Sequence, residues 1–302
     1  DPAWSITASV VFVMLVQGLS GVAKDLAKMS SKSAVKILAP ATGGGLFRWV
    51  ATLTGSKNAV KGSGFLLGAV LLAAFGFVPS VLTMAAVLFV ILIGVVTGMP
   101  KGLPVGRKDA KFSEVFSKNR NINWLSAARL FLFGARDVWF VVGLPIYFYA
   151  VLSDGTTESN RTAFFMIGTF MAVWTILYGI VQGSAPRILK AASQSDAEIL
   201  ALAKRWVGLL IIVPAFLAGL VWLVPEPSNV LTATIVLGLL VFGGTFAVNS
   251  ALHSFLILSL TDAKRVTMDV GFYYMANSVG RLVGTVLSGF TYQMGGLSLC
   301  LG

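Results

Sequence analysis

The 302-residue sequence is 56% hydrophobic and only 12% charged, which is about half the charged fraction of an ordinary soluble domain. This composition excludes a soluble globular protein. The net charge of +11 does not indicate nucleic-acid binding, because the basic residues interrupt apolar runs instead of forming a polar basic surface. One cysteine and one histidine exclude a disulfide framework, a Cys/His metal site and a Cys/His catalytic pair, and we expect no cofactor.

Eight stretches of the chain are long and apolar enough to form membrane-spanning helices. A helix needs about 20 mostly apolar residues to cross a hydrocarbon core of about 30 Å. Short turns separate the second span from the third and the sixth from the seventh. The sequence therefore predicts an all-α, polytopic helical membrane protein, with spans at residues 4–23, 47–77, 79–99, 123–152, 162–183, 206–224, 230–260 and 266–292.

The distribution of lysine and arginine between the connections predicts the orientation. Nearly all loop lysines and arginines follow the first, third, fifth and seventh spans, whereas the opposite connections hold Arg161 alone. Short basic connections stay in the cytoplasm. We therefore expect residue 1 outside the cell and the basic connections inside, in an inner or plasma membrane.

The connection 100–122 is the most polar internal stretch and predicts a cytoplasmic linker between two helical bundles. Residues 1–99 then hold three spans, and residues 123–302 hold five spans and the start of a sixth. This arrangement predicts a piece of a six-plus-six transporter that lacks its first three helices and most of the last. The paired glycines of 64–68 and 280–284 favour a repeat of this kind.

Two arginines in the fourth span are predicted to bind the substrate. Arg136 lies about 20 Å below the aromatic outer end of its helix, and Arg129 lies two turns earlier on the same face. Guanidinium groups bind oxyanions with two parallel hydrogen bonds, so an organic oxyanion is the expected ligand. Alternatively, Arg136 neutralises a structural carboxylate and Arg129 reaches the cytoplasmic headgroups. We do not expect that carboxylate to be Asp137, because sequence neighbours point about 100° apart on a helix.

Four more residues inside the spans are predicted to bind the same anion. Lys57 and Lys61 are four residues apart, with Asn58 between them, and like charges at that spacing repel unless an anion lies between them. Arg281, near the middle of the last span, must face protein or water. Alternatively, Lys57 reaches the inner membrane surface and Arg281 holds two helices together.

The remaining titratable residues have other expected roles. A lysine recurs at every fourth position from 24 to 36, and we interpret Lys32 and Lys36 as part of a solvated cytoplasmic extension that touches anionic lipid. Asp25 and Asp137 are the acids at or within a span that are suited to take up a proton, so we predict that they couple transport to protons. His253 is interpreted as a structural, hydrogen-bonded histidine.

Three segments resemble a known family. They are residues 19–34 (LSGVAKDLAKMSSKSA), 49–62 (WVATLTGSKNAVKG) and 125–140 (LSAARLFLFGARDVWF). They are similar to the organoarsenical efflux permeases of bacterial arsenic-resistance operons, the ArsJ group of the major facilitator superfamily, and the similarity extends over the whole chain. The loop pattern common to the superfamily leaves only a trace, at residues 183–187 (GSAPR).

The resemblance implies a function and partners. It implies a transporter, not an enzyme, that exports 1-arseno-3-phosphoglycerate across the bacterial inner membrane and confers arsenate resistance. A partner glyceraldehyde-3-phosphate dehydrogenase would make this ester from arsenate, and the ester would hydrolyse to arsenate outside. The substrate carries a phosphate, an arsenate ester and a carboxylate, which suits the embedded basic residues. The expected partners are this small anion and the lipid bilayer, with no nucleic acid.

Three other functions stay open. The same arginines suit an exporter or exchanger of another organophosphate or of an inorganic anion. A membrane-embedded lipid-phosphate transferase would need a buried acid–base or metal-binding group of residues, which one histidine and scattered aspartates do not supply. A receptor or scaffold would support no flux of substrate.

Overall fold

The computed structural model describes residues 4–38, 45–98, 116–190, 195–224, 226–262 and 265–302, and every regular element in these ranges is a helix. The all-α prediction is confirmed for this part of the chain. Each predicted span corresponds to one helix, except that the fourth forms a continuous run of α4, a π-helical turn η2 and α5. The elements are α1 (Ile6–Leu38), α2 (Gly45–Phe75), α3 (Phe77–Gly98), α4 (Arg120–Val138), η2 (Trp139–Gly143), α5 (Leu144–Leu152), α6 (Thr157–Ile188), α7 (Asp196–Leu223), α8 (Asn229–Ser259) and α9 (Val266–Leu301).

Six of these stretches are long and apolar enough to cross a membrane. The two other predicted spans, α2 and α9, have 31 and 36 residues, so they match the six in length but are not among them. These two helices carry Lys57, Lys61 and Arg281. The chain thus has the pattern of a multi-pass membrane protein, with candidate spans at Ile6–Lys36, Phe77–Gly98, Arg120–Leu152, Thr157–Ile188, Ala197–Leu223 and Asn229–Ser259.

Polar caps explain why two helices begin before their apolar stretches. The Thr156 hydroxyl accepts a hydrogen bond from the Ser159 backbone N–H at 3.3 Å, and α6 starts at the next residue. Ser195 and Glu198 form a reciprocal capping box at the start of α7. Such caps satisfy backbone N–H groups that a first turn leaves unpaired. The two helices therefore begin five and ten residues before the predicted spans at 162 and 206.

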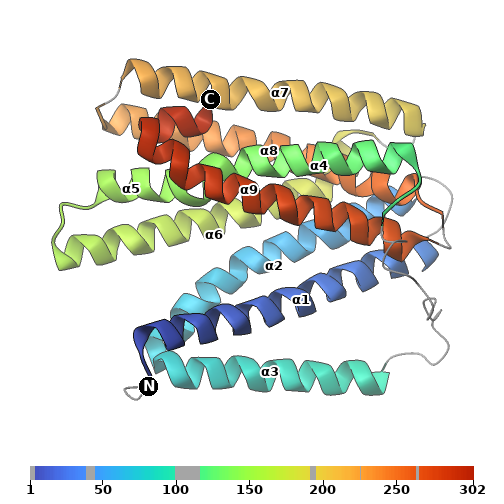
Figure 1. Cartoon of the computed structure of the whole chain (residues 1–302), viewed down its shortest axis with the longest axis horizontal. Helices are drawn as coiled ribbons and strands as arrows, with labels where there is room; N and C mark the ends of the chain where they lie inside the picture. Colours follow the sequence, from blue (N-terminus) through green and yellow to red (C-terminus); the bar gives the residue numbers. More distant parts are fainter. Residues whose placement is uncertain (1–3, 39–44, 99–115, 191–194, 225, 263–264) are drawn as a thin grey trace.

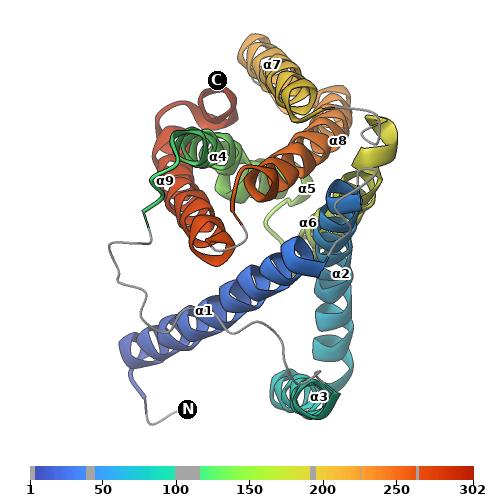
Figure 2. The same cartoon turned by 90° about the vertical axis from the view of Figure 1, so that its right-hand side faces the viewer.

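Helices α4 to α9 form a compact bundle, and α1, α2 and α3 lie along one side of it (Figures 1 and 2). The helix ends that flank the basic connections gather at one end of the molecule, on the right in Figure 1. Most of the predicted linker, residues 100–115, and the side chain of Arg161 lie outside the described residues. Two bundles joined by a linker therefore stay a prediction.

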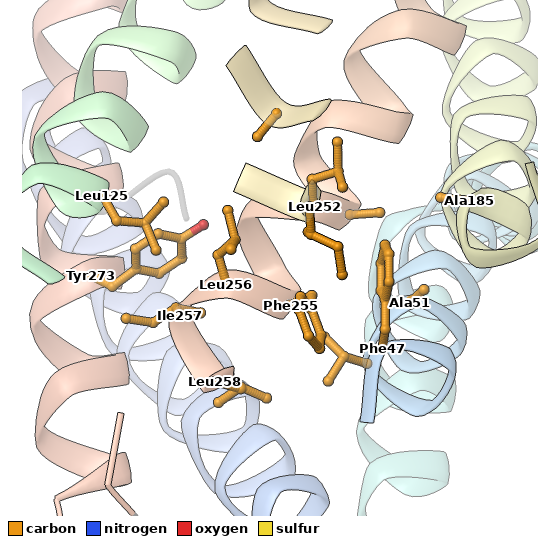
Figure 3. Packing of buried hydrophobic residues seen from close by; sticks show 14 of the residues in the cluster. Phe47, Ala51, Leu125, Ala185, Leu252, Phe255, Leu256, Ile257, Leu258 and Tyr273 are labelled. Atoms are coloured by element: carbon orange, nitrogen blue, oxygen red, sulfur yellow. The ribbon is translucent and has the colours of Figure 1, made fainter. Parts of the chain in front are cut away.

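Helix α8 is the central element of the packed region. It contacts α2, α4, α6, α7 and α9, and its residues 246–258 are buried without interruption. Near one end of this stretch, the Phe255 ring packs on Phe47 of α2 with ring centroids 4.9 Å apart. Tyr273 of α9 lies beside Leu125 of α4 in the same cluster (Figure 3). A helix buried on all sides in this way brings its polar residues to the meeting point of the other helices.

Two helix pairs approach closely through glycines. On the antiparallel pair α2 and α6, a Cβ atom added to Gly55 would lie 2.5 Å from the carbonyl oxygen of Gly179. On the parallel pair α4 and α9, Gly134 meets Gly280 and Gly284 in the same manner. Small residues allow such backbone contact in membrane bundles. These two contacts hold α2 and α9 against the neighbours with which they build the polar interior.

The glycines that suggested an internal repeat do not pack alike. Gly280 and Gly284 contact α4, whereas a Cβ atom added to Gly64 or Gly68 would meet no described atom of another helix within 4 Å. On α2 the packed glycines are Gly55 and Gly62. The spacing of glycines in the sequence is therefore not matched by equivalent helix contacts.

The chain turns near its described end. Gly295 and Gly296 interrupt α9, and Gly296 adopts a φ of 63°, a conformation that glycine tolerates best. The turn follows the predicted end of the last span at residue 292 by a few residues. Leu297 and Cys300 after the turn are buried. Whether these residues begin a further span stays a prediction.

Candidate functional site

A chain of hydrogen bonds links five helices in the interior. Asn58 of α2 donates to the Gln182 side-chain oxygen of α6 at 2.6 Å, and Gln182 donates to the Ser250 hydroxyl of α8 at 3.2 Å. The same hydroxyl accepts from Arg129 Nη1 of α4 at 3.1 Å, and Arg129 Nε donates to Asn277 of α9, also at 3.1 Å. We call these five residues the polar network. It joins the helices on which the substrate-binding residues were predicted.

Arg129 is the charged centre of this network. Its residue exposure is 5%, and its guanidinium carbon lies 3.7 Å from the Phe133 ring centroid and 5.3 Å from that of Tyr273. No carboxylate of the described residues forms an ion pair with it, and its hydrogen bonds use Nε and Nη1, leaving Nη2 as a spare donor. The headgroup contact that was the alternative interpretation does not fit its burial. A buried cation held only by neutral groups and rings carries an uncompensated cost, which an anion would offset.

Further buried polar groups surround the network. Within the part of the chain that the structure describes, the Asn249 amide, the His253 Nδ1 atom, and the hydroxyls of Ser126, Ser254 and Tyr273 have no hydrogen-bond partner. They lie on α4, α8 and α9. The hydrogen bond expected of a structural histidine is therefore not found at His253 Nδ1. Polar groups of this kind provide donors and acceptors for the oxygens of a polar ligand.

Two turns further along α4, a carboxylate is shared by two arginines. Arg136 Nε donates to Asp137 Oδ1 at 2.8 Å, and Arg281 Nε of α9 donates to Asp137 Oδ2 at 2.7 Å. The expectation that Asp137 is not the partner of Arg136 was wrong. Although the two Cα–Cβ bonds diverge, the long arginine side chain folds back around the helix and reaches the neighbouring carboxylate.

This shared pair compensates a fully buried charge. The Asp137 side chain is 0% exposed, that of Arg136 is 12% exposed and that of Arg281 is 48% exposed. A buried carboxylate requires charged partners, and two guanidinium groups leave one positive charge in excess. Arg281 thereby joins α9 to α4, as its alternative interpretation anticipated. Anion binding by Arg136 and Arg281, and proton uptake by Asp137, stay predictions.

A π-helical turn follows directly after these residues. Pro145 has no backbone N–H, and the Leu144 N–H donates to the Trp139 carbonyl, five residues earlier. The proline removes one regular helical hydrogen bond, and the backbone widens to a π turn. Such turns occur often at functional sites, and this one lies next to Asp137.

A cavity of about 230 Å³ lies between α1, α2 and α9. Helix α1 contacts both of these helices (Figure 2). The Lys32 and Lys28 ammonium groups lie 5.0 and 6.0 Å from the Tyr274 ring centroid. We call this cavity the lysine pocket; its lining residues are Lys24, Ala27, Lys28, Ser31, Lys32, Leu53, Thr54, Lys57 and Tyr274.

The interpretation of Lys32 and Lys36 as a solvated extension was wrong. Lys32 is 3% exposed, and its Nζ atom has no hydrogen-bond partner among the described residues. Lys36 donates from Nζ to the Leu258 carbonyl oxygen at 2.5 Å. That carbonyl belongs to the last turn of α8, where carbonyl groups lack intrahelical partners and favour a cation. Because α1 continues as a helix to Leu38, both lysines are carried back against the bundle.

The other predicted residues are distributed differently. Lys57 lines the lysine pocket, whereas Asn58 belongs to the polar network. Lys61 is exposed, with Nζ 5.6 Å from the Phe65 ring centroid, and it lines neither feature. Asp25 accepts a hydrogen bond from Lys28 at 2.5 Å at the edge of the pocket. The structure thus divides the predicted site into two parts on α2, and binding by Lys61 stays a prediction.

Sequence reasoning missed several members of both features. Gln182 and Asn277 are amide side chains within apolar helices, which often hydrogen-bond across membrane helices, so their polarity was a usable signal. Ser250 and Tyr274 had no such signal, because serine and tyrosine are common in these helices. Lys32 was misjudged because its neighbours in the sequence are polar.

No protein-family model, curated protein or solved structure matches this chain. The residues of the polar network and the lysine pocket therefore carry the functional assignment.

Proposed function

We propose that this protein is a secondary-active exporter of an organic oxyanion. The observation that carries the proposal is Arg129, a buried guanidinium with a spare donor, held by neutral groups where five helices meet. In a low-dielectric interior, such a cation attracts an anion more strongly than an exposed one does. The lysine pocket and the second pair of arginines add positive charge along the same interior.

The proposed substrate is 1-arseno-3-phosphoglycerate, exported across the bacterial inner membrane. Support comes from the three segments that resemble organoarsenical efflux permeases, of which residues 125–140 contain Arg129 and Arg136. A substrate with a phosphate, an arsenate ester and a carboxylate offers several negative groups to the embedded cations. The proposal includes a partner glyceraldehyde-3-phosphate dehydrogenase that forms the ester in the cytoplasm.

The proposed mechanism is alternating access in a major-facilitator-type protein, with residues 1–99 and 123–302 as the two moving parts. The α2–α6 contact and the hydrogen bond from Asn58 to Gln182 lie between these parts. In this mechanism an incoming anion binds Arg129 and competes with Asp137 for Arg136. The carboxylate of Asp137 is then released to take up a proton, which couples export to proton entry.

Cells that lack other arsenic exporters provide the test. They express the full-length protein, the dehydrogenase, or both, and cell-associated arsenic is measured after exposure to arsenate. We expect low arsenic only when both are present, and loss of this effect with Arg129→Met, because its spare donor and charge are removed. The matched control is Arg205→Met, an exposed arginine of α7. Equal membrane levels are verified by immunoblotting. Normal export by Arg129→Met would contradict the role of this residue.

The second candidate function is export or exchange of another organophosphate or of an inorganic anion. It is favoured by the donors themselves, since guanidinium and ammonium groups bind phosphate and arsenate oxygens in the same way. Proteoliposomes loaded with 3-phosphoglycerate separate the two candidates. Flux of 3-phosphoglycerate without arsenate would support the second candidate. A second set of vesicles holds the dehydrogenase with glyceraldehyde 3-phosphate, arsenate and NAD⁺, so that the arseno ester forms in the lumen as NAD⁺ is reduced. If only this ester leaves the vesicles, the first candidate holds.

A further inference from the structure

The lysine pocket combines positive charge with graded access. Lys24 and Lys57 are exposed, Lys28 is partly buried, and Lys32 is 3% exposed. The pocket therefore leads from the surface of the molecule to a buried ammonium group. No carboxylate is among its lining residues. Asp25, which pairs with Lys28 at the edge, offsets only one of the four lysine charges.

Two uncharged polar groups of the pocket are already occupied as donors. Thr54 donates its hydroxyl hydrogen to the Val50 carbonyl oxygen, and Ser31 donates to the Ala27 carbonyl oxygen, both at 2.7 Å within their own helices. The lysine ammonium groups and the Tyr274 hydroxyl are the donors left for a ligand, and Lys32 Nζ uses none of its three with the described residues. This donor set suits an oxyanion and disfavours a cation or a neutral sugar.

The charge and size of the pocket define the ligand further. Lysines from two different helices line it together, Lys32 of α1 and Lys57 of α2. Like charges brought together in this way repel, and burial adds a desolvation cost for Lys32. A ligand group with two negative charges offsets both the repulsion between the lysines and the desolvation cost of Lys32. A volume of about 230 Å³ holds a small organic anion, since a water molecule takes about 30 Å³ of liquid volume.

We propose that the lysine pocket binds the phosphate-type end of the transported anion, a tetrahedral oxyanion with two negative charges, with Lys32 and Lys57 as its direct partners. This assignment rests on the proposed export function and names the first binding position on the path from the basic end of the molecule. On α1, Lys28 and Lys24 lie about one and two turns farther from that end than Lys32, and Tyr274 also lines the pocket. The same tetrahedral chemistry occurs in a lipid phosphodiester, which carries a single negative charge.

Thermal unfolding of the full chain in uncharged detergent tests the pocket. The probes are inorganic phosphate, 3-phosphoglycerate and phosphatidylglycerol, each compared with chloride at equal ionic strength. We expect phosphate and 3-phosphoglycerate to raise the unfolding temperature. Lys32→Met should raise the unfolding temperature in the absence of ligand, because a buried unpaired charge is removed. The same variant should bind phosphate about tenfold more weakly or worse, because a charge-assisted hydrogen bond is lost. The control Lys204→Met, at an exposed lysine of α7, should keep the full response.

The outcomes separate the pocket from the transport function. A phosphate response that Lys32→Met retains, or a response to phosphatidylglycerol alone, would overturn the assignment. If the wild type responds to phosphate through Lys32 but proteoliposomes show no anion flux, the export function fails and the pocket stands. If flux occurs and Lys32→Met changes neither flux nor phosphate binding, the export function stands and the pocket assignment fails.

Discussion

At the scale of single residues, the interior is organised by how each buried charge is compensated. Asp137 is shared by Arg136 and Arg281, whereas Arg129 has hydrogen bonds to neutral groups, and the Lys32 ammonium has no hydrogen-bond partner among the described residues. A compensated charge is suited to holding helices together, and an uncompensated one to binding a ligand. The distinction separates the two arginines that are paired with a carboxylate from Arg129 and Lys32, which are not.

Stability measurements on Asp137 test this compensation. Asp137→Asn should lower the free energy of unfolding by about 3–5 kcal/mol, because the buried Arg136 loses its partner. Arg136→Met should cost less, since Arg281 still neutralises the carboxylate. The double variant Arg136→Met/Asp137→Asn should be more stable than Asp137→Asn alone. Thermal unfolding in detergent measures the order of stability of these three variants and the wild type. If Asp137→Asn is as stable as the wild type, the shared ion pair contributes nothing to the fold.

The sequence predicted that these charges are embedded but not which of them are paired. A charge within an apolar span must face protein or water, and this rule located Arg129, Arg136 and Arg281 in the interior. The partner of Arg136 depends on how a long side chain folds around its helix and on where α9 places Arg281. Both are set by packing between helices 144 residues apart. Helical spacing alone does not contain this information.

At the scale of elements, apolar runs defined where helices cross the interior, and polar groups defined where they end. The predicted span at 230–260 matches α8 (Asn229–Ser259) closely, since its apolar stretch and its helix coincide. The span at 4–23 falls short of α1, which continues through its lysines to Leu38. Apolar length cannot predict such an extension, because α1 is held there by contacts with α2 and α9.

The glycine contact between α4 and α9 predicts unequal effects of identical substitutions. A Cβ atom at Gly280 would collide with the backbone carbonyl of Leu130, whereas one at Gly289 on the same helix meets no described atom within 4 Å. Gly280→Ala should therefore destabilise the protein by about 1–3 kcal/mol through overpacking. Gly289→Ala should be neutral or slightly stabilising, since alanine favours a helix.

Thermal unfolding of both alanine variants, with anion export as a second measurement, checks this prediction. Because Gly280 is one turn from Asn277 and precedes Arg281, separation of α4 from α9 should also reduce export. Equal unfolding temperatures for the two variants would show that the close helix contact is not required.

At the scale of the whole molecule, charge is distributed along the long axis of the bundle. The helix ends that flank the basic connections lie at one end of the molecule (Figure 1), and Lys36 and Arg265 belong to helix ends there. The lysine pocket lies in the part of α1 nearer this end, and Asp137 lies further along α4. An anion that enters at the basic end would meet the lysine pocket and Arg129 before Arg136 and Asp137. This order matches export only if the basic end faces the cytoplasm.

Orientation can be measured with single cysteines, because Cys300 is the one native cysteine and is buried. In a Cys300→Ser background, Glu158→Cys lies at the start of α6 and Lys118→Cys just before α4, and both positions are exposed. On spheroplasts, a membrane-impermeant maleimide should label Glu158→Cys at once and Lys118→Cys only after permeabilisation. This follows from the cytoplasmic retention of short basic connections. The reverse labelling pattern would place the lysine pocket on the outer side, and anions entering there would be imported.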